Sequence, residues 1–355
     1  MAIETNKTNK RQDFIIFLLE TRGSLSILSI MEATIKNTAS VSKVTVNRDL
    51  KKLIKLGLIK KEGKGRAVFY SLSEHYNLIK TIEVENYFKT EPDRRTAHDR
   101  FNFQIFSFFK NIFTNEEKIW LTDLNEKYQN NTKHLSATII KQEMERLIIE
   151  FSWKSSQIEG NTYTLLETEV LIKESKEAAG HKKEEAIMIL DHKNALDFIL
   201  KNNNEFKKIT LGKIEHIHSM ITKNLGIPRN IRKSPVGVTG TKYKPLDNEW
   251  QIKEALEKSC AVINSEEDVF AKSIISSIMV AYVQPFEDGN KRTARILSNA
   301  ILLVNNSCPL SYRSANEAEY KKAVLLFFEQ NNISYFKKLF MQQYEFAVDN
   351  YFRFV

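Results

Sequence analysis

The sequence is poor in cysteine, and this limits the kinds of site that it can build. Its 355 residues include two cysteines, Cys260 and Cys308, which form no Cys-x-x-Cys pair. Both lie in apolar stretches with helical periodicity, so we expect them to be reduced thiols in a core. The sequence therefore excludes a disulfide framework and a metal site built on paired cysteines.

Long apolar runs are missing as well. The longest, residues 274–283 and 296–304, are interrupted by Ser, Tyr or Asn, and a membrane-spanning helix needs roughly 20 apolar residues. The first residues, MAIETNKTNKRQD, are polar and lack the apolar stretch and small-residue cleavage site of a secretory signal. We expect no membrane helix, no export and a cytoplasmic location. The sequence also shows no internal repeat and no low-complexity tract.

The positive charge is concentrated at one end of the chain. The net charge is +9, and the first 70 residues hold 14 bases against 6 acids, while the rest is close to neutral. With 42% hydrophobic residues, the chain is long enough for two or three domains. A small basic module joined to a neutral body predicts that the module binds a polyanion and that the body has another task.

Residues 1–75 show the periodicity of three helices followed by a hairpin. A first helix is expected around Asp13 to Glu20, ending at Gly23, and a second, short helix is expected from a cap at or near Ser24 through Met31, with a turn over residues 37–40. A third helix should begin at the cap residue Ser42 and end at Gly57. Its expected inward-facing residues are Val46, Leu50, Leu53, Ile54 and Leu56. Alternating residues around a Gly-rich tip at 62–65 predict a hairpin over residues 58–72.

This order is that of a winged helix-turn-helix, and residues 42–59 resemble the bacterial DeoR-type pattern S-x-x-T-x-x-R-D-L-x-x-L-x-x-x-G-L-I in register. Because an α-helix fits the major groove, the third helix is expected to reach base edges or phosphates, and the hairpin to contact the DNA backbone. A protein-docking or dimerisation module with a solvated basic face is the alternative. The expected DNA-binding residues are Lys43, Thr45, Asn47 and Arg48 of the helix and Lys60, Lys61, Lys64 and Arg66 of the hairpin.

Residues 76–135 form a helical connector in the predicted organisation. Pro92 marks a break between helices. The segment is rich in aromatic residues, whose spacing favours an inter-domain core over a ligand cage. These residues are Tyr87, Phe88, Phe101, Phe103, Phe106, Phe108, Phe109 and Phe113.

Residues 271–304 read as helix, polar loop, helix. The loop contains Gly289 and leads into a helix whose first amides, together with nearby basic side chains, form an anion-binding nest. Arg292 and Arg295 are three residues apart and share one helix face. Asp288 is the carboxylate directly beside the nest that could carry a Mg²⁺ ion bridging two phosphates. A purely structural helix connector is the alternative.

Residues 284–295, QPFEDGNKRTAR, resemble the Fic motif H-P-F-x-D-G-N-G/K-R-x-x-R at every position except the first. The resemblance to the Fic family extends over about residues 139–340. It implies ATP as substrate, with Asp288 holding Mg²⁺ and Phe286 anchoring the loop. The implied nucleotide-binding residues are Gly289, Asn290, Lys291, Arg292 and Arg295.

The departure lies at Gln284, where the family has a histidine. In that family the histidine takes a proton from a target hydroxyl as the hydroxyl attacks the α-phosphorus of ATP, so that AMP passes to Ser, Thr or Tyr. An amide accepts no proton near neutral pH, and loss of a general base costs about 10² to 10⁴ in rate. We therefore expect AMP transfer to be weakened or lost while nucleotide binding survives.

Residues 155–161, SSQIEGN, resemble the inhibitory S/T-x-x-x-E-G/N motif of Fic proteins, in the class whose inhibitory helix precedes the core. The implied inhibitory residues are Ser155, Glu159 and Gly160. Glu159 is expected to pair with Arg295 and so to hinder the productive binding of ATP. The alternative is an ordinary exposed glutamate at the end of a helix.

Residues 237–245 have β-branched residues around a Gly turn and resemble the Fic flap, a hairpin that would bind a target segment by β-augmentation. An ordinary surface hairpin is the alternative. The implied flap residues are Val238, Thr239, Gly240, Thr241 and Tyr243. His216 and His218 face different sides of a helix expected over residues 211–223, so a packing role is favoured over a zinc pair.

The predicted fold is mostly α: an all-α Fic core over residues 136–345 with a small β-hairpin flap, preceded by an α+β winged-helix domain. The predicted function is that of an autoinhibited protein adenylyltransferase relative, weakened at Gln284, with DNA bound by the N-terminal domain. The alternative is an ATP-sensing transcription regulator without transferase activity. ATP, Mg²⁺ and DNA are the expected ligands; the target protein, the DNA sequence and a homo-oligomeric state stay open.

Overall fold

The computed structural model describes residues 8–38 and 41–353, apart from the side chains of Thr38 and Arg66. Within this part, the chain forms two compact units. The smaller unit runs to residue 81 and includes residues 107–116, and the larger unit comprises residues 82–106 and the chain from residue 117 onward. The three-part division of the sequence, with boundaries at residues 75 and 135, stays a prediction.

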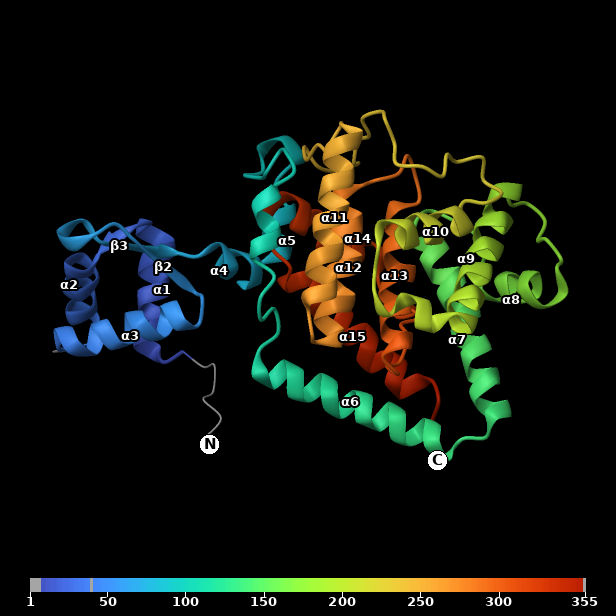
Figure 1. The fold of residues 1–355 in the computed structure, drawn as a ribbon, viewed down its shortest axis with the longest axis horizontal. Helices are drawn as coiled ribbons and strands as arrows, with labels where there is room; N and C mark the ends of the chain where they lie inside the picture. Colours follow the sequence, from blue (N-terminus) through green and yellow to red (C-terminus); the bar gives the residue numbers. More distant parts are fainter. Residues whose placement is uncertain (1–7, 39–40, 354–355) are drawn as a thin grey trace. The chain divides into compact units, whose positions relative to one another are not determined.

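The smaller unit packs helices against a three-stranded antiparallel sheet with the strand order β1-β3-β2. In the longer pair, Ile59 lies opposite Leu72 and Glu62 opposite Phe69. Its elements are α1 (Lys10–Arg22), β1 (Leu25–Ser26), α2 (Ile27–Thr38), α3 (Lys43–Lys55), β2 (Ile59–Glu62), β3 (Phe69–Leu72) and α4 (Glu74–Ile79) (Figure 1). The predicted order of three helices followed by a hairpin is confirmed, whereas β1 was not predicted.

The start and end of α3 follow from its caps. The side chain of Ser42 accepts a hydrogen bond from the amide of Thr45, and Gly57 has a positive φ of 72° just after the helix. Val46, Leu50 and Leu53 are buried as predicted. Ile54 is 37% exposed, so its predicted inward position is wrong, because it lies beside the buried stripe rather than on it.

The second helix differs from the prediction. The chain first forms β1, and the hydroxyl of Ser26, rather than that of Ser24, accepts the amide of Ser29 at 3.2 Å. The helix then runs past Met31 to Thr38, because no Gly or Pro interrupts residues 27–38. Part of the predicted turn is thus helical, and residues 39 and 40 lie outside the described part of the chain.

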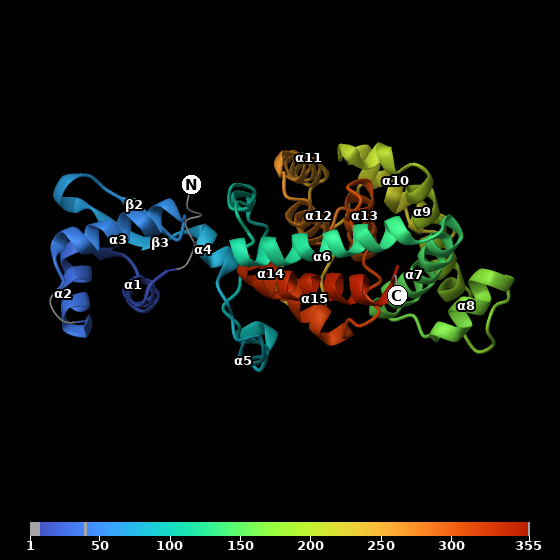
Figure 2. The same ribbon diagram turned by 90° about the horizontal axis from the view of Figure 1, so that it is seen from below.

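The larger unit is a helical assembly. Its helices are α5 (Val84–Phe88), α6 (Asn115–His134), α7 (Ala137–Ile158), α8 (Leu165–Glu174), α9 (Lys183–Lys201), α10 (Leu211–Ile221), α11 (Glu249–Ser265), α12 (Val269–Val283), α13 (Asn290–Val304), α14 (Glu317–Gln330) and α15 (Ser334–Asn350). Helix α6 runs alongside α15 (Figure 2), where Asn125 accepts a hydrogen bond from Tyr344 at 2.8 Å.

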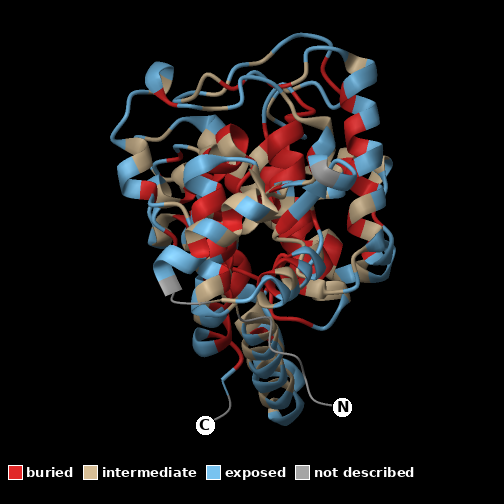
Figure 3. Cartoon of the chain, turned by 90° about the vertical axis from the view of Figure 1, so that its left-hand side faces the viewer, coloured by how far each residue is buried: buried red, intermediate tan, exposed pale blue. Residues whose placement is uncertain are grey.

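The centre of the larger unit is the pair α12 and α13. Helix α12 is apolar nearly all round and is buried along almost its whole length, with α11, α13 and α14 packed against it. Figure 3 shows the buried residues gathered on the interior helices of this unit. The hydroxyls of Ser273 and Ser298 lie 2.7 Å apart and join α12 to α13. The loop between these two helices is therefore fixed at both ends by buried helices.

The aromatic cluster predicted for the connector is divided between the units. Phe108, Phe109 and Phe113 belong to the smaller unit, and the other five belong to the larger one. There, Phe101 stacks on Tyr282 of α12 with the ring centroids 4.6 Å apart.

The predicted fold class, a mostly helical chain with an α+β N-terminal domain, is confirmed. The hairpin predicted for the flap is not formed. Residues 236–245 make a turn at Gly240, and the one ladder contact given for them is an isolated bridge from Lys244 to Arg100. The reason is that hydrogen-bonding groups of this segment, such as the carbonyl of Gly240, bond to residues 95–100 instead of to each other. No helix within the described residues is both long and apolar enough to cross a membrane.

Candidate nucleotide site and DNA-binding surface

The loop between α12 and α13 presents the N-terminal end of α13. Gly289 stands just before this helix with φ at 81°, and a Cβ atom there would lie 3.3 Å from Thr222 and 3.4 Å from His218. Only glycine combines that conformation with such close packing. The first amides of α13 have no partner within the helix and point towards the loop, where they favour an anion.

Phe286 and Asn290 hold the loop in shape. Phe286 is fully buried and stacks on His218 with the centroids 3.7 Å apart, so its predicted anchoring position is confirmed. The side-chain amide of Asn290 donates to the carbonyl of Phe286 and accepts from its N–H, both at 2.8 Å. The side chain of Asn290 is thus used within the loop, which leaves its backbone amide for a phosphate.

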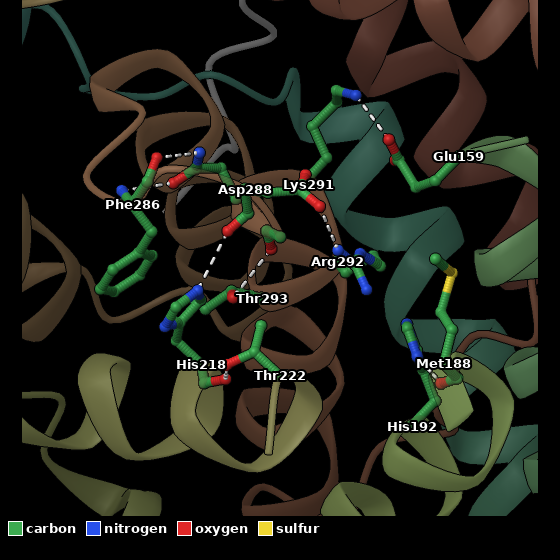
Figure 4. Close-up of polar contacts among 12 residues, drawn as sticks. Glu159, Met188, His192, His218, Thr222, Phe286, Asp288, Lys291, Arg292 and Thr293 are labelled. Atoms are coloured by element: carbon green, nitrogen blue, oxygen red, sulfur yellow. Dashed lines mark hydrogen bonds and ion pairs between the residues drawn. The ribbon is translucent and has the colours of Figure 1, made fainter. Parts of the chain in front are cut away.

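His218 supports the loop from below, as Figure 4 shows. Its Nε2 lies 3.0 Å from the carbonyl of Asp288 and donates to it, because a carbonyl only accepts. Burial lowers the pKa of His218 to about 4. His216 is exposed on another side of α10 and packs on Phe198. The predicted packing role of His218 is therefore confirmed, and among the described residues no group of three or more His, Cys, Asp or Glu is placed to hold a metal.

Gln284 occupies a left-handed conformation at the C-terminal end of α12, with φ at 51°, a region that a residue other than Gly or Asn seldom adopts. Its amide donates to the carbonyl of Ala281 at 2.6 Å and accepts from Asn290 at 3.0 Å. Arg232 fixes the backbone, since its Nε donates to the carbonyl of Gln284 at 2.7 Å. Both ends of the Gln284 amide are therefore used inside the loop.

Two arginines of α13 lie beneath this surface. Arg292 is buried and donates to Asp288 at 2.8 Å, while the Asp288 side chain is 69% exposed. Burial lowers the pKa of Arg292, although the nearby charge of Asp288 opposes this. The Nη1 atoms of Arg292 and Arg295 are buried without a hydrogen-bond partner. A buried guanidinium with an unused donor fits an anionic ligand.

Glu159 at the end of α7 bonds two cations of α13. Its Oε1 accepts from Arg295 at 2.9 Å. Its Oε2 accepts from Lys291 at 2.5 Å, as Figure 4 shows. The contact with Arg295 is the one predicted, whereas the contact with Lys291 was not. Burial alone would raise the pKa of Glu159, but the charges of Arg295 and Lys291 outweigh it and lower the pKa to about 2. The Glu159 carboxylate thus stands where it competes with another anion for both cations.

This pKa predicts how the Glu159 contacts depend on pH. A depressed pKa means that the ionised carboxylate stabilises the fold fully above pH 4.5, and that this contribution is lost as the pH falls towards about 2. In urea unfolding, the difference in free energy of unfolding between the wild type and Glu159→Gln should therefore be constant between about pH 5 and 8 and should shrink below about pH 4.5. A difference that already changes near pH 7 would contradict the assignment.

Ser155 positions Arg295 from the other side. Its hydroxyl accepts from the Nε of Arg295 at 2.9 Å and lies 3.1 Å from the Nε2 of His192. Nδ1 of His192 donates to the carbonyl of Met188 at 2.7 Å, so in the neutral ring Nε2 accepts from the Ser155 hydroxyl. Burial, followed by the charge of Arg292, lowers the pKa of His192 to about 3. Nothing in the sequence marked His192, because it lies outside every motif.

A cavity of about 500 Å³ opens above the loop. It is bounded by Glu159 and Gly160, by the loop, by the flap and by α14. The predicted site residues on its wall are Glu159, Gly160, Val238, Thr239, Gln284, Asp288, Gly289, Asn290, Lys291 and Arg292. Sequence analysis missed the α14 side, which consists of Lys321, Val324, Leu325 and Phe328. These residues carry no local signal, since only the fold brings α14 to the loop.

The flap residues do not all face this cavity. Val238 and Thr239 line it, whereas Thr241 and Tyr243 do not. Tyr243 is 2% exposed and donates to the carbonyl of Tyr282 at 2.8 Å. The ring of Tyr243 is packed in the core between Tyr282 and Phe328, and the target-binding role of the flap residues stays a prediction.

The basic surface of the smaller unit is partly as expected. Lys43 and Arg48 on α3 and Lys64 near the hairpin tip are exposed, while the side chain of Arg66 lies outside the described part. Thr45 and Asn47 are half-buried; the hydroxyl of Thr45 lies 3.0 Å from that of Ser42, and the amide of Asn47 donates to the carbonyl of Lys43. Their side chains are thus engaged locally, so a role in reading bases requires these bonds to be exchanged for bonds to DNA.

Two families match the two units. The model of the Fic/DOC family matches residues 208–302, and that of the DeoR-like helix-turn-helix domain matches residues 11–71. A probable protein adenylyltransferase of Aquifex aeolicus is 31% identical over 110 residues, which are 30% of this chain and 33% of that protein. The protein adenylyltransferase fic-1 of Caenorhabditis elegans is 24% identical over 204 residues, which are 56% of this chain and 39% of that protein. The chain thus spans about a third of the length of these curated relatives.

Solved structures share the fold. A Fic-domain signaling protein of Bacteroides thetaiotaomicron covers 64% of this chain and 95% of its own, with a TM-score of 0.55 and 18% identity. A fragment of Fic-1 of C. elegans covers 97% of this chain and 98% of its own, with a TM-score of 0.56 and 16% identity. At these identities the likeness concerns the fold. The chain therefore contains a Fic/DOC domain, matched over residues 208–302, and a DeoR-like helix-turn-helix domain, matched over residues 11–71.

Proposed function

We propose that this protein is an autoinhibited relative of the protein adenylyltransferases, which binds ATP with Mg²⁺, transfers AMP weakly or not at all because of Gln284, and binds DNA through its N-terminal domain. The observation that carries the nucleotide assignment is the combination of the α13 N-terminus with a buried arginine, Arg292, whose Nη1 has no partner. Backbone amides and a guanidinium together are suited to a polyphosphate.

The residues present also fit Mg²⁺. Protein sites for this ion commonly supply one or two carboxylates and leave the other positions to water and phosphate oxygens. The exposed carboxylate of Asp288 on the wall of the cavity meets that requirement. When bound, the ion would neutralise charge on the phosphates; Asp288 would hold it, and Arg292 would then exchange its bond to Asp288 for one to a phosphate.

Weak transfer is inferred from the side chains around the loop. Gln284 has an amide whose two ends are both bonded inside the loop. The histidine nearest the loop, His218, donates to the carbonyl of Asp288 and so offers no free acceptor at Nε2. Neither side chain is placed to take a proton from a hydroxyl in the cavity.

Autoinhibition is inferred from Glu159. A triphosphate that bonds to Lys291 and Arg295 must displace the Glu159 carboxylate from both of them. With a pKa of about 2 for Glu159, protonation does not release these contacts at neutral pH. Release therefore requires either a movement of α7 or replacement of the residue.

Glu159→Gly provides the test. We expect the affinity for Mg-ATP, measured by calorimetry, to rise about 5- to 150-fold, which is the usual range for coupling between two sites. In a crystal soaked with Mg-ATP, the γ-phosphate should lie near Arg295. Glu169→Gly is a matched control, because Glu169 pairs with an exposed lysine on α8, away from the cavity. Unchanged affinity and pose in Glu159→Gly would refute autoinhibition by this residue.

The alternative is a transcription regulator that senses ATP without transferring any group. The hydrogen bonds of the Gln284 amide favour this regulator, because they give residue 284 a structural role in the loop, and an amide cannot accept a proton in catalysis. Incubation with ATP labelled at the α-phosphate, beside DNA binding with and without Mg-ATP, separates the two. Labelled protein supports the transferase, whereas a nucleotide-dependent DNA affinity without label supports the sensor. The cytoplasmic location and a homo-oligomeric state stay predictions from the sequence.

A further inference from the structure

Residues 82–106, here called the strap, follow directly on residue 81, where the first segment of the smaller unit ends, yet they pack within the larger unit. A buried ion pair fastens the strap to α14. The Nη1 of Arg95 donates to both carboxylate oxygens of Glu329, at 3.0 and 3.1 Å, and the two side chains are 5% and 0% exposed. The hydroxyl of Tyr87 donates to the same carboxylate at 2.6 Å. Several hydrogen bonds thus support the buried charge pair, as such a pair requires, although the Nε of Arg95 has no partner among the described residues.

Arg95 also reaches the flap. Its Nη2 donates to the carbonyl of Gly240 at 2.8 Å. Gly240 forms the turn of the flap, with φ at 85°, and directly follows Val238 and Thr239 on the cavity wall. One guanidinium therefore joins the strap, α14 and the turn next to the wall of the cavity, which its planar fork of donors allows.

Further contacts join the strap to the flap and to the helix before the loop. The amide of Lys244 donates to the carbonyl of Asp99 at 2.9 Å. The amide of Asn102 donates to the hydroxyl of Tyr282 at 3.0 Å, and Phe101 stacks on the same ring. Tyr282 lies two residues before Gln284. The strap thus contacts both the flap and the last turn of α12.

We propose that Arg95 is a positioning residue that fixes the flap wall of the cavity, and that the strap couples this cavity to the smaller unit. The flap has no strand ladder of its own; Tyr243 is packed in the core, and the turn at Gly240 is held by its bond to Arg95 of the strap. Segments held by few bonds open at low free energy. A movement of the strap therefore changes the position of the flap. By thermodynamic linkage, a ligand bound in the cavity changes the position of the strap. The inference rests on the proposed function only for the identity of that ligand.

Arg95→Lys tests the positioning role. Lysine keeps the charge beside Glu329, but it lacks the planar fork through which Arg95 bonds to Glu329 with one nitrogen and to the carbonyl of Gly240 with another. In the absence of nucleotide, we expect the rate of amide hydrogen exchange in residues 236–243 to rise about tenfold. This factor is the one expected for the loss of a single hydrogen bond to a charged group. Lys322→Met is the matched control: Lys322 joins α14 to Glu85 of the strap at 2.6 Å, but Glu85 is 71% exposed and neither residue contacts the flap.

The affinities complete the test. In Arg95→Lys, the dissociation constant for Mg-ATP should rise about tenfold. The change in DNA affinity that Mg-ATP causes should become smaller than in the wild type. The DNA affinity measured without nucleotide should stay at the wild-type value. A merely structural role would lower both affinities. If Arg95→Lys unfolds, the pair Arg95→Met with Glu329→Met replaces the buried charges by apolar side chains and should raise flap exchange in the same way.

The outcomes are separable. The positioning role is overturned if amide exchange of the flap is the same in Arg95→Lys, or in the double variant, as in Lys322→Met. This outcome does not depend on the identity of the ligand. A raised flap exchange without a change in the coupling between Mg-ATP and DNA overturns the role of the strap. Absence of Mg-ATP binding in the wild type overturns the proposed function instead, since the exchange measurement requires no nucleotide.

Discussion

Replacing Gln284 by histidine in a Glu159→Gly background is expected to raise AMP transfer about 10²- to 10⁴-fold, the usual contribution of a general base. The loop that would orient ATP is kept in shape partly by two bonds between the Asn290 side chain and the Phe286 backbone, which do not involve the side chain of residue 284. A histidine there, held in the same backbone conformation by Arg232, would bring a ring nitrogen to the cavity.

The measurement is the transfer of label from ATP marked at the α-phosphate to the protein itself and to candidate proteins. Glu159→Gly alone and Glu159→Gly with Gln284→Ala are the controls, because both relieve the proposed inhibition without supplying a base. If the histidine variant binds Mg-ATP yet transfers no AMP, more than one residue separates this protein from an active transferase, and the sensor function gains support.

The affinity of the smaller unit for duplex DNA is expected to fall roughly 10²-fold between 50 and 200 mM salt. That figure corresponds to about four neutralised phosphates, with a slope near −0.9 per contact in a plot of log K against log salt. The exposed cations among the predicted DNA-binding residues are the candidates for these contacts: Lys43 and Arg48 on α3, and Lys60, Lys61 and Lys64 of the hairpin.

Filter binding across a salt series measures this slope. Lys43→Ala and Lys64→Ala should each reduce it by about one unit. Lys127→Ala is the control, since Lys127 is an exposed cation of the larger unit paired with Asp349. DNA affinity that is indifferent to salt, or no binding at low salt, would favour the alternative of a protein-docking module.

Short-range signals in the sequence predicted the elements well. Ser42 and Gly57 marked the ends of α3, and the Gly-rich tip marked the hairpin, because caps and turns depend on the residues at those positions. The second helix was predicted too short, since a polar tail without Gly or Pro continues a helix as readily as it ends one. The flap hairpin failed for a related reason: residues 237–245 have the pattern of a hairpin, but their backbone groups bond to the strap.

The site divides in the same way. The motif at residues 284–295 predicted the loop and the position of Phe286, and the resemblance of residues 155–161 to the Fic inhibitory motif implied the approach of Glu159 to Arg295. The contact of Lys291 with Glu159, the support of Ser155 by His192 and the α14 wall of the cavity had no signal, because each joins residues far apart in the chain.

By itself, the sequence determined the local chemistry of this protein: an anion-binding helix start, an amide in place of a proton acceptor, and a basic helix in the N-terminal domain. Those properties depend on residue types at fixed short spacings. Only the tertiary structure decided that Glu159 also neutralises Lys291, which flap residues face the cavity, and that Arg95 joins the flap to α14. Such contacts depend on the packing of helices that lie far apart in the chain, and residue spacing carries no record of that packing.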